Sequence, residues 1–167
     1  MVPRVHSRFT HVQWRCALAA PMLLAGKGNS MTKKPLIAIV DDDESMRETM
    51  KDLLDSAGFS AVTFTSAESF LKSKRARTVP CLITDMRMPG MTGLELHQRL
   101  VAAGRSIPTI LITAYPDDVV RAQAAKAGIL CYLPKPFASE VLLECVDSAL
   151  RGQGPGSGQP SQREGER

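Results

Sequence analysis

Carboxylate side chains follow two apolar runs of the sequence at the points where those runs end. Residues 36–40 are followed by Asp41 and Asp42, and residues 81–84 are followed by Asp85. If the two runs are neighbouring parallel strands, the three carboxylates converge at one edge of a sheet. Carboxylates crowded together repel one another unless a hard cation lies among them. The pattern therefore indicates a cation site.

A hydroxyl group and an amine follow two further apolar runs. Residues 109–113 end at Thr113, and residues 131–133 lead into a Pro-Lys-Pro sequence that contains Lys135. An acidic cluster, a separate Asp, a hydroxyl group and a lysine together suggest a Mg²⁺-assisted phosphoryl acceptor. The sequence thus predicts phosphoryl chemistry at this edge of the sheet.

The elements that must position these residues alternate between strands and helices. Short apolar runs predict buried strands, and apolar residues at helical spacing predict amphipathic helices. Ser45 with Glu48 fits a capping box, and Ser66 and Thr92 are further candidate N-caps. We expect strands at 36–40, 61–64, 81–84, 109–113 and 130–133, and helices at 45–57, 66–73, 92–103, 117–127 and 139–150.

Strand–helix units of this kind imply a mostly parallel sheet with helices on both faces. Right-handed crossovers leave few possible strand orders. Doubly wound sheets place their site beyond the carboxyl ends of the strands, where the strand order reverses. In the order 2-1-3-4-5 that reversal lies between the strands at 36–40 and 81–84. The topology and the chemistry therefore point to the same place.

Composition and charge divide the chain into a body and two tails. Its 167 residues fit one domain, and 44% of them are hydrophobic, which is enough for a core. The net charge is +4, but residues 35–150 contain fifteen acidic and only twelve basic residues. This body shows no charge pattern for nucleic acid. Residues 151–167 are mostly Gly, Pro, Ser, Gln and charged residues, and we expect them to be a disordered tail.

Residues 1–34 form a basic N-terminal extension, with six basic residues and no acidic ones. We expect it to be disordered or to lie upstream of the natural start. Residues 16–26 are an apolar patch of about the length of a signal-peptide core, so a secretory signal is an alternative. The patch is too short to span a membrane. We favour Met31, which is followed by Thr-Lys-Lys, as the natural start.

The four cysteines show no metal-binding spacing. Cys16, Cys81, Cys131 and Cys145 form neither a Cys-x-x-Cys motif nor a cluster with His. Cys81 and Cys131 begin apolar runs, and Cys145 shares the apolar face of the last helix with residues such as Val141. We therefore expect buried free thiols in a reducing cytoplasm.

The body of the chain resembles the receiver domain of two-component response regulators, in particular the chemotaxis-type and nitrogen-fixation-regulator-type receivers. The resemblance covers residues 35–150. It rests on four motifs in order: the acidic pair, Asp85 with a following Met-Pro-Gly, Thr113 with Ala114, and Lys135 with a following Pro-Phe. It implies an α/β, flavodoxin-like fold: a doubly wound, five-stranded parallel sheet of order 2-1-3-4-5. It also implies a phosphoryl acceptor that signals by binding, and not an enzyme.

The resemblance implies a role for each acidic residue. Asp85 matches the phosphoacceptor. Asp41 and Asp42 match the acidic pair that holds Mg²⁺ together with Asp85 and the backbone carbonyl at the position of Arg87. Mg²⁺ keeps several waters, so a few carboxylates and one carbonyl suffice to hold it.

The resemblance also implies which groups bind the phosphoryl oxygens and which report the change. Thr113, the backbone amide of Ala114 and Lys135 match the phosphoryl-binding groups. Thr113 and Tyr132 match the switch pair, in which the aromatic ring turns inward when the threonine moves. In the family, the bond that matches Lys135–Pro136 is cis.

Two positions near the acceptor vary among family members. Arg87 lies two residues after Asp85, and Tyr115 lies two residues after Thr113. Bulk and charge at these two positions can control how the hydrolytic water reaches the site. We predict that Arg87 and Tyr115 tune the lifetime of the phosphoryl group.

The resemblance implies a sensor histidine kinase or a phosphotransfer protein as donor, and a downstream protein target that the sequence does not identify. A transient homodimer through 117–127, 130–133 and the last helix fits the family pattern. Because residues 151–167 are too few for a helix-turn-helix output domain, we expect no direct binding of nucleic acid; a lost output domain is an alternative. We expect no membrane association and a cytoplasmic location.

Two other classes of protein remain as alternatives. A Mg²⁺ phosphohydrolase with an Asp nucleophile commonly has a second acid two residues later, and this chain has Arg87 there. A scaffold with the same shape would bind without phosphorylation, and the complete acceptor set argues against it. Nucleotide-binding glycine loops are absent from the sequence.

Overall fold

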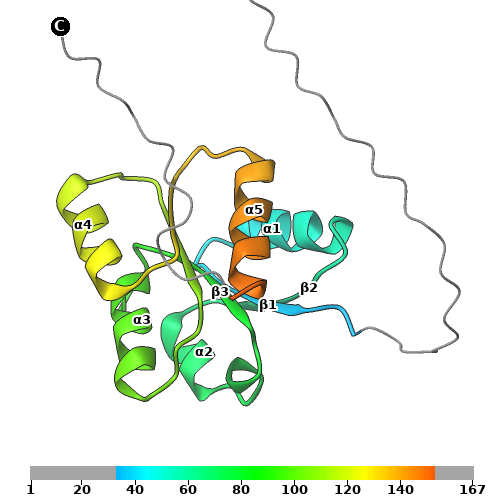
Figure 1. Ribbon diagram of the computed structural model, residues 1–167, viewed down its shortest axis with the longest axis horizontal. Coiled ribbons are helices and arrows are strands. Elements are labelled where there is room, and N and C mark those ends of the chain that lie inside the picture. The colour runs from blue at the N-terminus through cyan, green and yellow to red at the C-terminus, as the bar shows by residue number, and fades with distance from the viewer. Residues whose placement is uncertain (1–32, 153–167) are drawn as a thin grey trace, which may run out of the picture. The chain divides into compact units, whose positions relative to one another are not determined.

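A five-stranded parallel sheet forms the middle layer of the structure, a computed structural model that describes residues 33–152 (Figure 1). The strands are β1 (Leu36–Val40), β2 (Ser60–Phe64), β3 (Cys81–Asp85), β4 (Thr109–Thr113) and β5 (Cys131–Pro134). Their order is β2-β1-β3-β4-β5, and every neighbouring pair is parallel. The predicted fold class and strand order are therefore confirmed.

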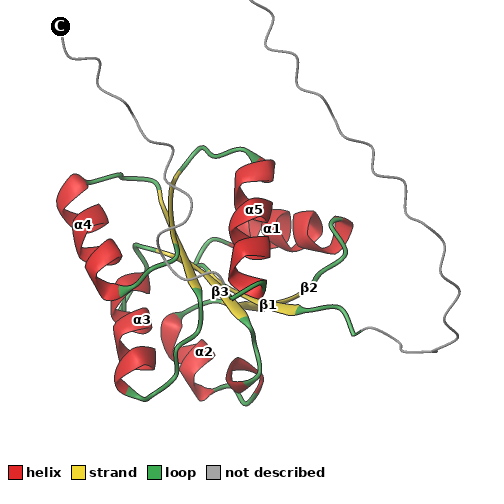
Figure 2. Ribbon diagram, viewed as in Figure 1, coloured by secondary structure: helices red, strands yellow, loops and turns green. Residues whose placement is uncertain are grey.

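Helices cover both faces of this sheet (Figure 2). The helices α1 (Glu44–Ser56) and α5 (Ser139–Leu150) share one hydrophobic cluster with β1, β3 and β4. The helices α2 (Ala67–Lys72), α3 (Gly93–Ala102) and α4 (Asp118–Ala127) pack on the opposite face in two further clusters. A single 3₁₀ turn, Arg75–Arg77, lies between α2 and β3.

The two central strands anchor the site because they are buried along their whole length. All residues of β3 and β4 are buried, so Ile83, Ile110 and Ile112 are fully removed from water. Each such side chain contributes roughly 1.5–3 kcal/mol relative to an exposed one. The carboxyl ends of these strands are therefore rigid platforms for the residues that follow them.

The register of the sheet brings the predicted acidic residues level with one another. Val40 at the end of β1 pairs with Thr84 of β3. Since Asp41 and Asp85 are the next residues along each strand, both lie at the same height of the carboxyl edge. Lys135 follows β5 at this edge as well, because Thr113 pairs with Pro134.

Capping agrees with the predictions at two helices and differs at one. Ser66 and Thr92 are the N-caps of α2 and α3, each in a capping box. The predicted box of Ser45 with Glu48 is wrong, because α1 begins two residues earlier than that box requires. Asp43 is its N-cap, and the Asp43 side chain accepts from the backbone N–H groups of Ser45 and Met46.

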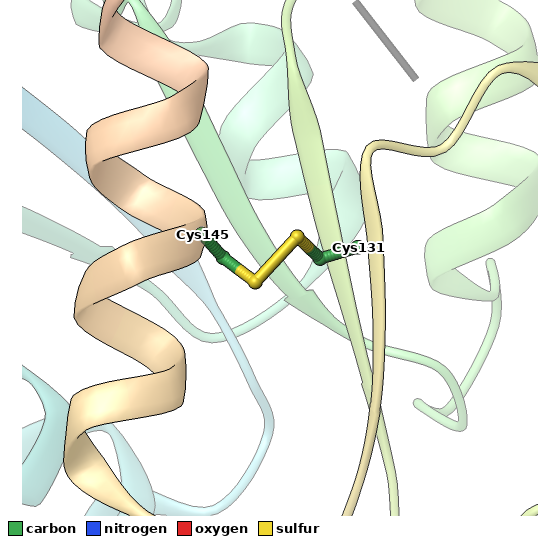
Figure 3. The surroundings of a disulfide bond; sticks show 2 residues. All are labelled: Cys131 and Cys145. Carbon is green, nitrogen blue, oxygen red and sulfur yellow. A yellow bond between two sulfur atoms is a disulfide. The ribbon is translucent and has the colours of Figure 1, made fainter. Parts of the chain in front are cut away.

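The prediction of free thiols is wrong for two of the four cysteines. Cys131 of β5 and Cys145 of α5 form a disulfide with a Cα–Cα distance of 6.3 Å (Figure 3). Cys81 is a buried free thiol, as predicted. Sequence spacing could not reveal the pair because 14 residues separate its members, and only the packing of α5 against the edge strand brings them together. Cys16 lies outside the described residues.

The apolar face of α5 also differs in one residue from the prediction. Leu142, Cys145, Val146 and Ala149 are buried, whereas Val141 is 41% exposed. The predicted N-terminal extension and C-terminal tail lie outside the described residues, apart from positions 33, 34, 151 and 152. Within 33–152, none of the helices is long and apolar enough to span a membrane.

Candidate functional site

Asp85, the last residue of β3, is the centre of a small polar cluster. One carboxylate oxygen, Oδ1, accepts a hydrogen bond from Lys135 Nζ at 2.8 Å. The other, Oδ2, accepts from the backbone N–H of Arg87 at 2.6 Å. These two bonds fix the plane of the carboxylate, while 8% of the residue stays exposed. Asp85 is therefore oriented and still within reach of a small ligand.

Asp41 directly follows β1 and is buried to 1% exposure. Its Oδ1 accepts from the backbone N–H of Asp43 at 2.9 Å, and its Oδ2 lies 3.5 Å from Lys135 Nζ. The backbone carbonyl of Asp41 accepts from Arg47 Nη1 of α1 at 2.8 Å. Asp42, the second member of the predicted acidic pair, is exposed beside it.

Burial and charge shift the protonation equilibria of this cluster. Burial raises the pKa of Asp41, and the negative charge of Asp85 raises it further, although the Asp43 hydrogen bond and Lys135 oppose this. Burial opposes the charge on Lys135, but its hydrogen bond to Asp85 and the charges of Asp41 and Asp85 outweigh burial and raise its pKa. Lys135 therefore stays protonated between two carboxylates.

The donor set fits a hard divalent cation of the Mg²⁺ type. Asp41 and Asp85 share a single ammonium group, and Asp42, the residue after Asp41 in the chain, is exposed. Among residues 33–152, no three His, Cys, Asp or Glu side chains lie close enough together to hold a metal ion by themselves. A cation that keeps several of its waters needs few protein oxygens, so the open, negatively charged arrangement suits it.

Thr113 and Ala114 lie at the end of β4, on the same edge of the sheet. The Thr113 hydroxyl donates to the carbonyl of Tyr115 at 3.1 Å and accepts from the Tyr115 backbone N–H at 3.1 Å. This local ring holds the hydroxyl within its own loop. Ala114 is exposed, and its methyl group is too small to cover the loop at that point.

Tyr132 on β5 lies next to the start of α4. Its hydroxyl accepts from the backbone N–H of Asp117, the N-cap of α4, at 3.3 Å. The guanidinium carbon of Arg121 lies 5.5 Å from the centre of the Tyr132 ring, a cation–π arrangement. The ring is thus held against α4 in this structure.

Arg87 and Tyr115, each two residues after a residue of the site, form a second cation–π pair. The Arg87 guanidinium carbon is 4.8 Å from the centre of the Tyr115 ring. Tyr115 is 65% exposed, and Arg87 is exposed as well. The two positions that the sequence singled out for access of water therefore contact each other.

Sequence reasoning missed two residues that shape the site. Arg47 reaches back across six positions to the carbonyl of Asp41, and a basic residue one turn into a helix gives no signal of that contact. Gly93, the first residue of α3, has no room for a side chain. A Cβ there would overlap the backbone carbonyl of Asp85 and touch Leu111. The glycine after a predicted N-cap was the available signal for this close approach.

A receiver fold with this cluster defines the class of protein, and the chain belongs to that class. The family described as response regulator receiver domain matches residues 37–147. The transcriptional regulatory protein FixJ of Bradyrhizobium diazoefficiens is 37% identical over 125 residues, which are 75% of this chain and 61% of FixJ. The response regulator protein TodT of Pseudomonas putida is 38% identical over 116 residues, 70% of this chain and 51% of TodT. The chain thus spans about half to three-fifths of the length of these relatives.

Solved structures agree with this assignment. The response regulator StyR is 44% identical and superposes with a TM-score of 0.64, covering 71% of this chain and 60% of StyR. The FixJ-N structure is 36% identical with a TM-score of 0.64, covering 71% of this chain and 94% of its own. The Lys135–Pro136 bond is cis, as the family resemblance implied.

Proposed function

We propose that this chain is the phosphoacceptor of a two-component phosphorelay. In this proposal Asp85 takes a phosphoryl group from a sensor histidine kinase or a phosphotransfer protein, and the phosphorylated form binds a protein target. The observation that carries the proposal is Lys135 between two carboxylates of the carboxyl edge, with Nζ 2.8 Å from Asp85 Oδ1. The positive charge of the Lys135 ammonium group offsets the negative charges of the acceptor carboxylate and of the phosphoryl group.

The transfer would be a displacement at phosphorus. An ionised oxygen of Asp85 attacks the phosphorus atom, and the new O–P bond forms as the bond to the leaving group breaks. The leaving group keeps the electron pair; it is a histidine nitrogen of the donor protein or the acetate of acetyl phosphate. The Arg87 N–H on Oδ2 and Lys135 on Oδ1 hold the carboxylate in one orientation for this attack.

Asp41, Asp42 and Asp85 would hold Mg²⁺, with the backbone carbonyl of Arg87 as a fourth protein ligand. When bound, the ion supplies positive charge that balances the phosphoryl oxygens. The Thr113 hydroxyl, the Ala114 amide and Lys135 would then contact those oxygens. For Thr113 this requires release from its hydrogen bonds with Tyr115.

Signalling would follow from the same movement. If Thr113 turns toward a phosphoryl oxygen, the space it leaves favours an inward position of the Tyr132 ring and changes the surface of α4, β5 and α5. We propose a protein as the target of this surface, because residues 35–150 carry more acidic than basic residues. The name of FixJ describes a transcriptional regulator, and that activity belongs to FixJ. We propose a cytoplasmic location, because the donor protein receives its phosphoryl group from ATP.

We propose that the chain is not a phosphohydrolase that turns over a substrate. A phosphohydrolase of this chemistry needs a general acid near the nucleophile. The residue two positions after Asp85 is Arg87, which has no carboxyl group and whose side chain stacks on Tyr115. We therefore propose self-catalysed phosphotransfer and dephosphorylation only.

Incubation with acetyl phosphate and Mg²⁺, followed by phosphate-affinity electrophoresis, tests the proposal. We expect a shifted band for the wild type, and no shift with EDTA or in Asp85→Asn. The matched control is Asp55→Asn, an exposed carboxylate in the last turn of α1 that lies far along the chain from the site. A shift that persists in Asp85→Asn contradicts the proposed acceptor. No shift in a folded wild type supports the binding scaffold instead.

A further inference from the structure

We infer that Cys131 and Cys145 are a reversible redox pair, and that their disulfide locks the β5–α5 segment that carries Tyr132 and Lys135. The bond joins the first residue of the edge strand to the middle of the last helix (Figure 3). The part of the inference that concerns phosphorylation rests on the proposed function. The redox part stands without it.

The backbone supports both states of the pair. The Cα atoms of Cys131 and Cys145 lie 6.3 Å apart, within the range that a disulfide spans without movement of the main chain. The helix does not depend on the bond for its position, because Leu142, Val146 and Ala149 are buried in the cluster shared with β1, β3 and β4. Reduction should therefore leave the fold intact.

Cys131 is the member of the pair that thiol reagents can reach first. β5 is one of the two edge strands of the sheet, and Cys131 on it is only partly buried. Cys145 keeps 8% of its surface exposed. Cys81, by contrast, lies on the central strand β3 with no exposed surface, and burial raises the pKa of its thiol to about 12. Since a thiolate is the attacking species, Cys81 should not exchange with the disulfide.

The oxidation that we infer uses a low-molecular-weight disulfide such as glutathione disulfide. The thiolate of Cys131 attacks one of its sulfur atoms and releases one glutathione, which leaves a mixed disulfide. The thiolate of Cys145 then attacks the Cys131 sulfur and releases the second glutathione. The two cysteines lose two protons and two electrons in total, and glutathione disulfide gains both. A dithiol reverses the reaction.

The disulfide closes a loop of residues 131–145, and this loop contains one residue that contacts the site and one that contacts α4. Lys135 bonds to Asp85 through Nζ, and its backbone N–H donates to the carbonyl of Thr113 at 2.7 Å. The Tyr132 hydroxyl accepts from the N–H of Asp117. A covalent link across the ends of this segment restricts the movement of both residues. Oxidation should therefore favour the arrangement in this structure, with Tyr132 against α4.

A redox titration of the full chain is the first test. The protein is equilibrated in glutathione buffers of graded potential, alkylated, digested, and analysed by mass spectrometry for each cysteine peptide. We expect Cys131 and Cys145 to change together as one two-electron couple while Cys81 stays reduced. A bond that never forms in these buffers, or one that dithiothreitol cannot reduce in the folded protein, overturns the inference.

Hydrogen exchange tests the lock independently of phosphorylation. We expect faster exchange in residues 131–150 of the reduced protein than of the oxidised protein, with β1 and β3 unchanged. Cys145→Ala should show the faster exchange in either buffer, whereas Cys81→Ala should respond to the buffer as the wild type does. Equal exchange of 131–150 in the oxidised and reduced wild type overturns the lock.

The rate of Asp85 phosphorylation by acetyl phosphate tests the functional link. We expect the oxidised protein to react about fivefold more slowly, the lower end of measured couplings between sites. Equal rates in the two redox states overturn the link. If neither state is phosphorylated while the titration and the exchange behave as expected, the proposed function fails and the redox pair stands.

Discussion

The buried Asp41 carboxylate lowers the stability of the folded protein, although the proposed site requires it. Its carboxylate is almost fully buried and shares Lys135 with Asp85. Its pKa is raised chiefly by burial, so ionisation of Asp41 costs free energy in the folded state. A group with a raised pKa stabilises the fold below its unfolded pKa, and that contribution is lost as the pH rises through its folded pKa.

Asp41→Asn should therefore be more stable than the wild type at pH 7, by about 1–2 kcal/mol in the free energy of unfolding. Urea denaturation at pH 7 and pH 4 measures this, and the difference should shrink at pH 4, where less of Asp41 is ionised in the wild type. Mg²⁺ should stabilise the wild type but not the variant, because ligand binding adds to stability only where the site is intact. A variant less stable than the wild type at pH 7 contradicts the argument.

The Arg87–Tyr115 pair lies close to Asp85, because the backbone N–H of Arg87 donates to the Asp85 carboxylate while its guanidinium group stacks on Tyr115. Removing either side chain opens a path for water, so Arg87→Ala and Tyr115→Ala should each shorten the lifetime of phosphorylated Asp85 by about two- to fivefold, consistent with ~0.5–1 kcal/mol for an exposed cation–π contact. The double variant should decay no faster than the more affected single one, because each change already breaks the pair. Decay after removal of acetyl phosphate, followed by phosphate-affinity gel, gives these rates. Additive effects would show that the two residues act separately.

At the scale of elements, the contact between α3 and the end of β3 sets the position of the acceptor. Gly93→Ala places a Cβ against the backbone carbonyl of Asp85, which cannot move aside without moving β3. We expect a loss of about 2–3 kcal/mol in the free energy of unfolding, as in other overpacked sites, together with slower phosphorylation. Gly104→Ala is the control: its φ is +72° and no atom lies near an added Cβ, so it reports backbone strain alone. A Gly93→Ala variant that is as stable as the wild type would rule out the close approach.

The N-terminus of α3 also carries a charge-dependent cap. Glu95 accepts from the backbone N–H and the hydroxyl of Thr92, and these bonds lower the pKa of Glu95. A lowered pKa means that the cap stabilises the fold above the unfolded pKa, and that this contribution disappears as the pH falls through the folded value. Glu95→Gln should thus be less stable than the wild type at pH 7 and should match it near pH 3.

Thermal unfolding at the two pH values measures this difference. Glu48→Gln is the matched control, because Glu48 is an exposed carboxylate on another helix, α1, and is not part of its N-cap. A gap for Glu95→Gln that is the same at both pH values would assign the effect to shape and not to charge.

The strands β1, β3 and β4 could be predicted because each is apolar for most of its length and has polar residues at its end or directly after it. Helix starts were harder: Ser45 and Asp43 are both good capping residues, and only the turn after Asp41 decides between them. The Cys131–Cys145 pair was beyond sequence reasoning, because a free buried cysteine and a bonded one share the same apolar surroundings. The site residues on strand ends were brought together by the sheet, whereas Arg47 depends on the direction of α1.

Over the whole molecule, the acceptor and the signalling surface are joined through β4, β5 and α4. Thr113 is tied to its own loop, while Tyr132 is tied to α4 through the Asp117 N–H and the Arg121 guanidinium. Both restraints are present in the arrangement that this structure shows. If the protein is in equilibrium with a second arrangement that lacks them, weakening either restraint raises the population of that second arrangement.

Arg121→Ala should therefore raise the rate of Asp85 phosphorylation. Loss of the guanidinium group releases Tyr132, and this release favours the same arrangement that phosphorylation favours. Loss of one cation–π contact of ~0.5–1 kcal/mol corresponds to an increase of about two- to fivefold. Lys126→Ala is the matched control, since it removes a positive charge from the same helix without touching the ring. Initial rates with acetyl phosphate and Mg²⁺ measure the effect. An equal increase in both variants would assign it to net charge, and no increase in either would mean that Tyr132 moves independently of the acceptor.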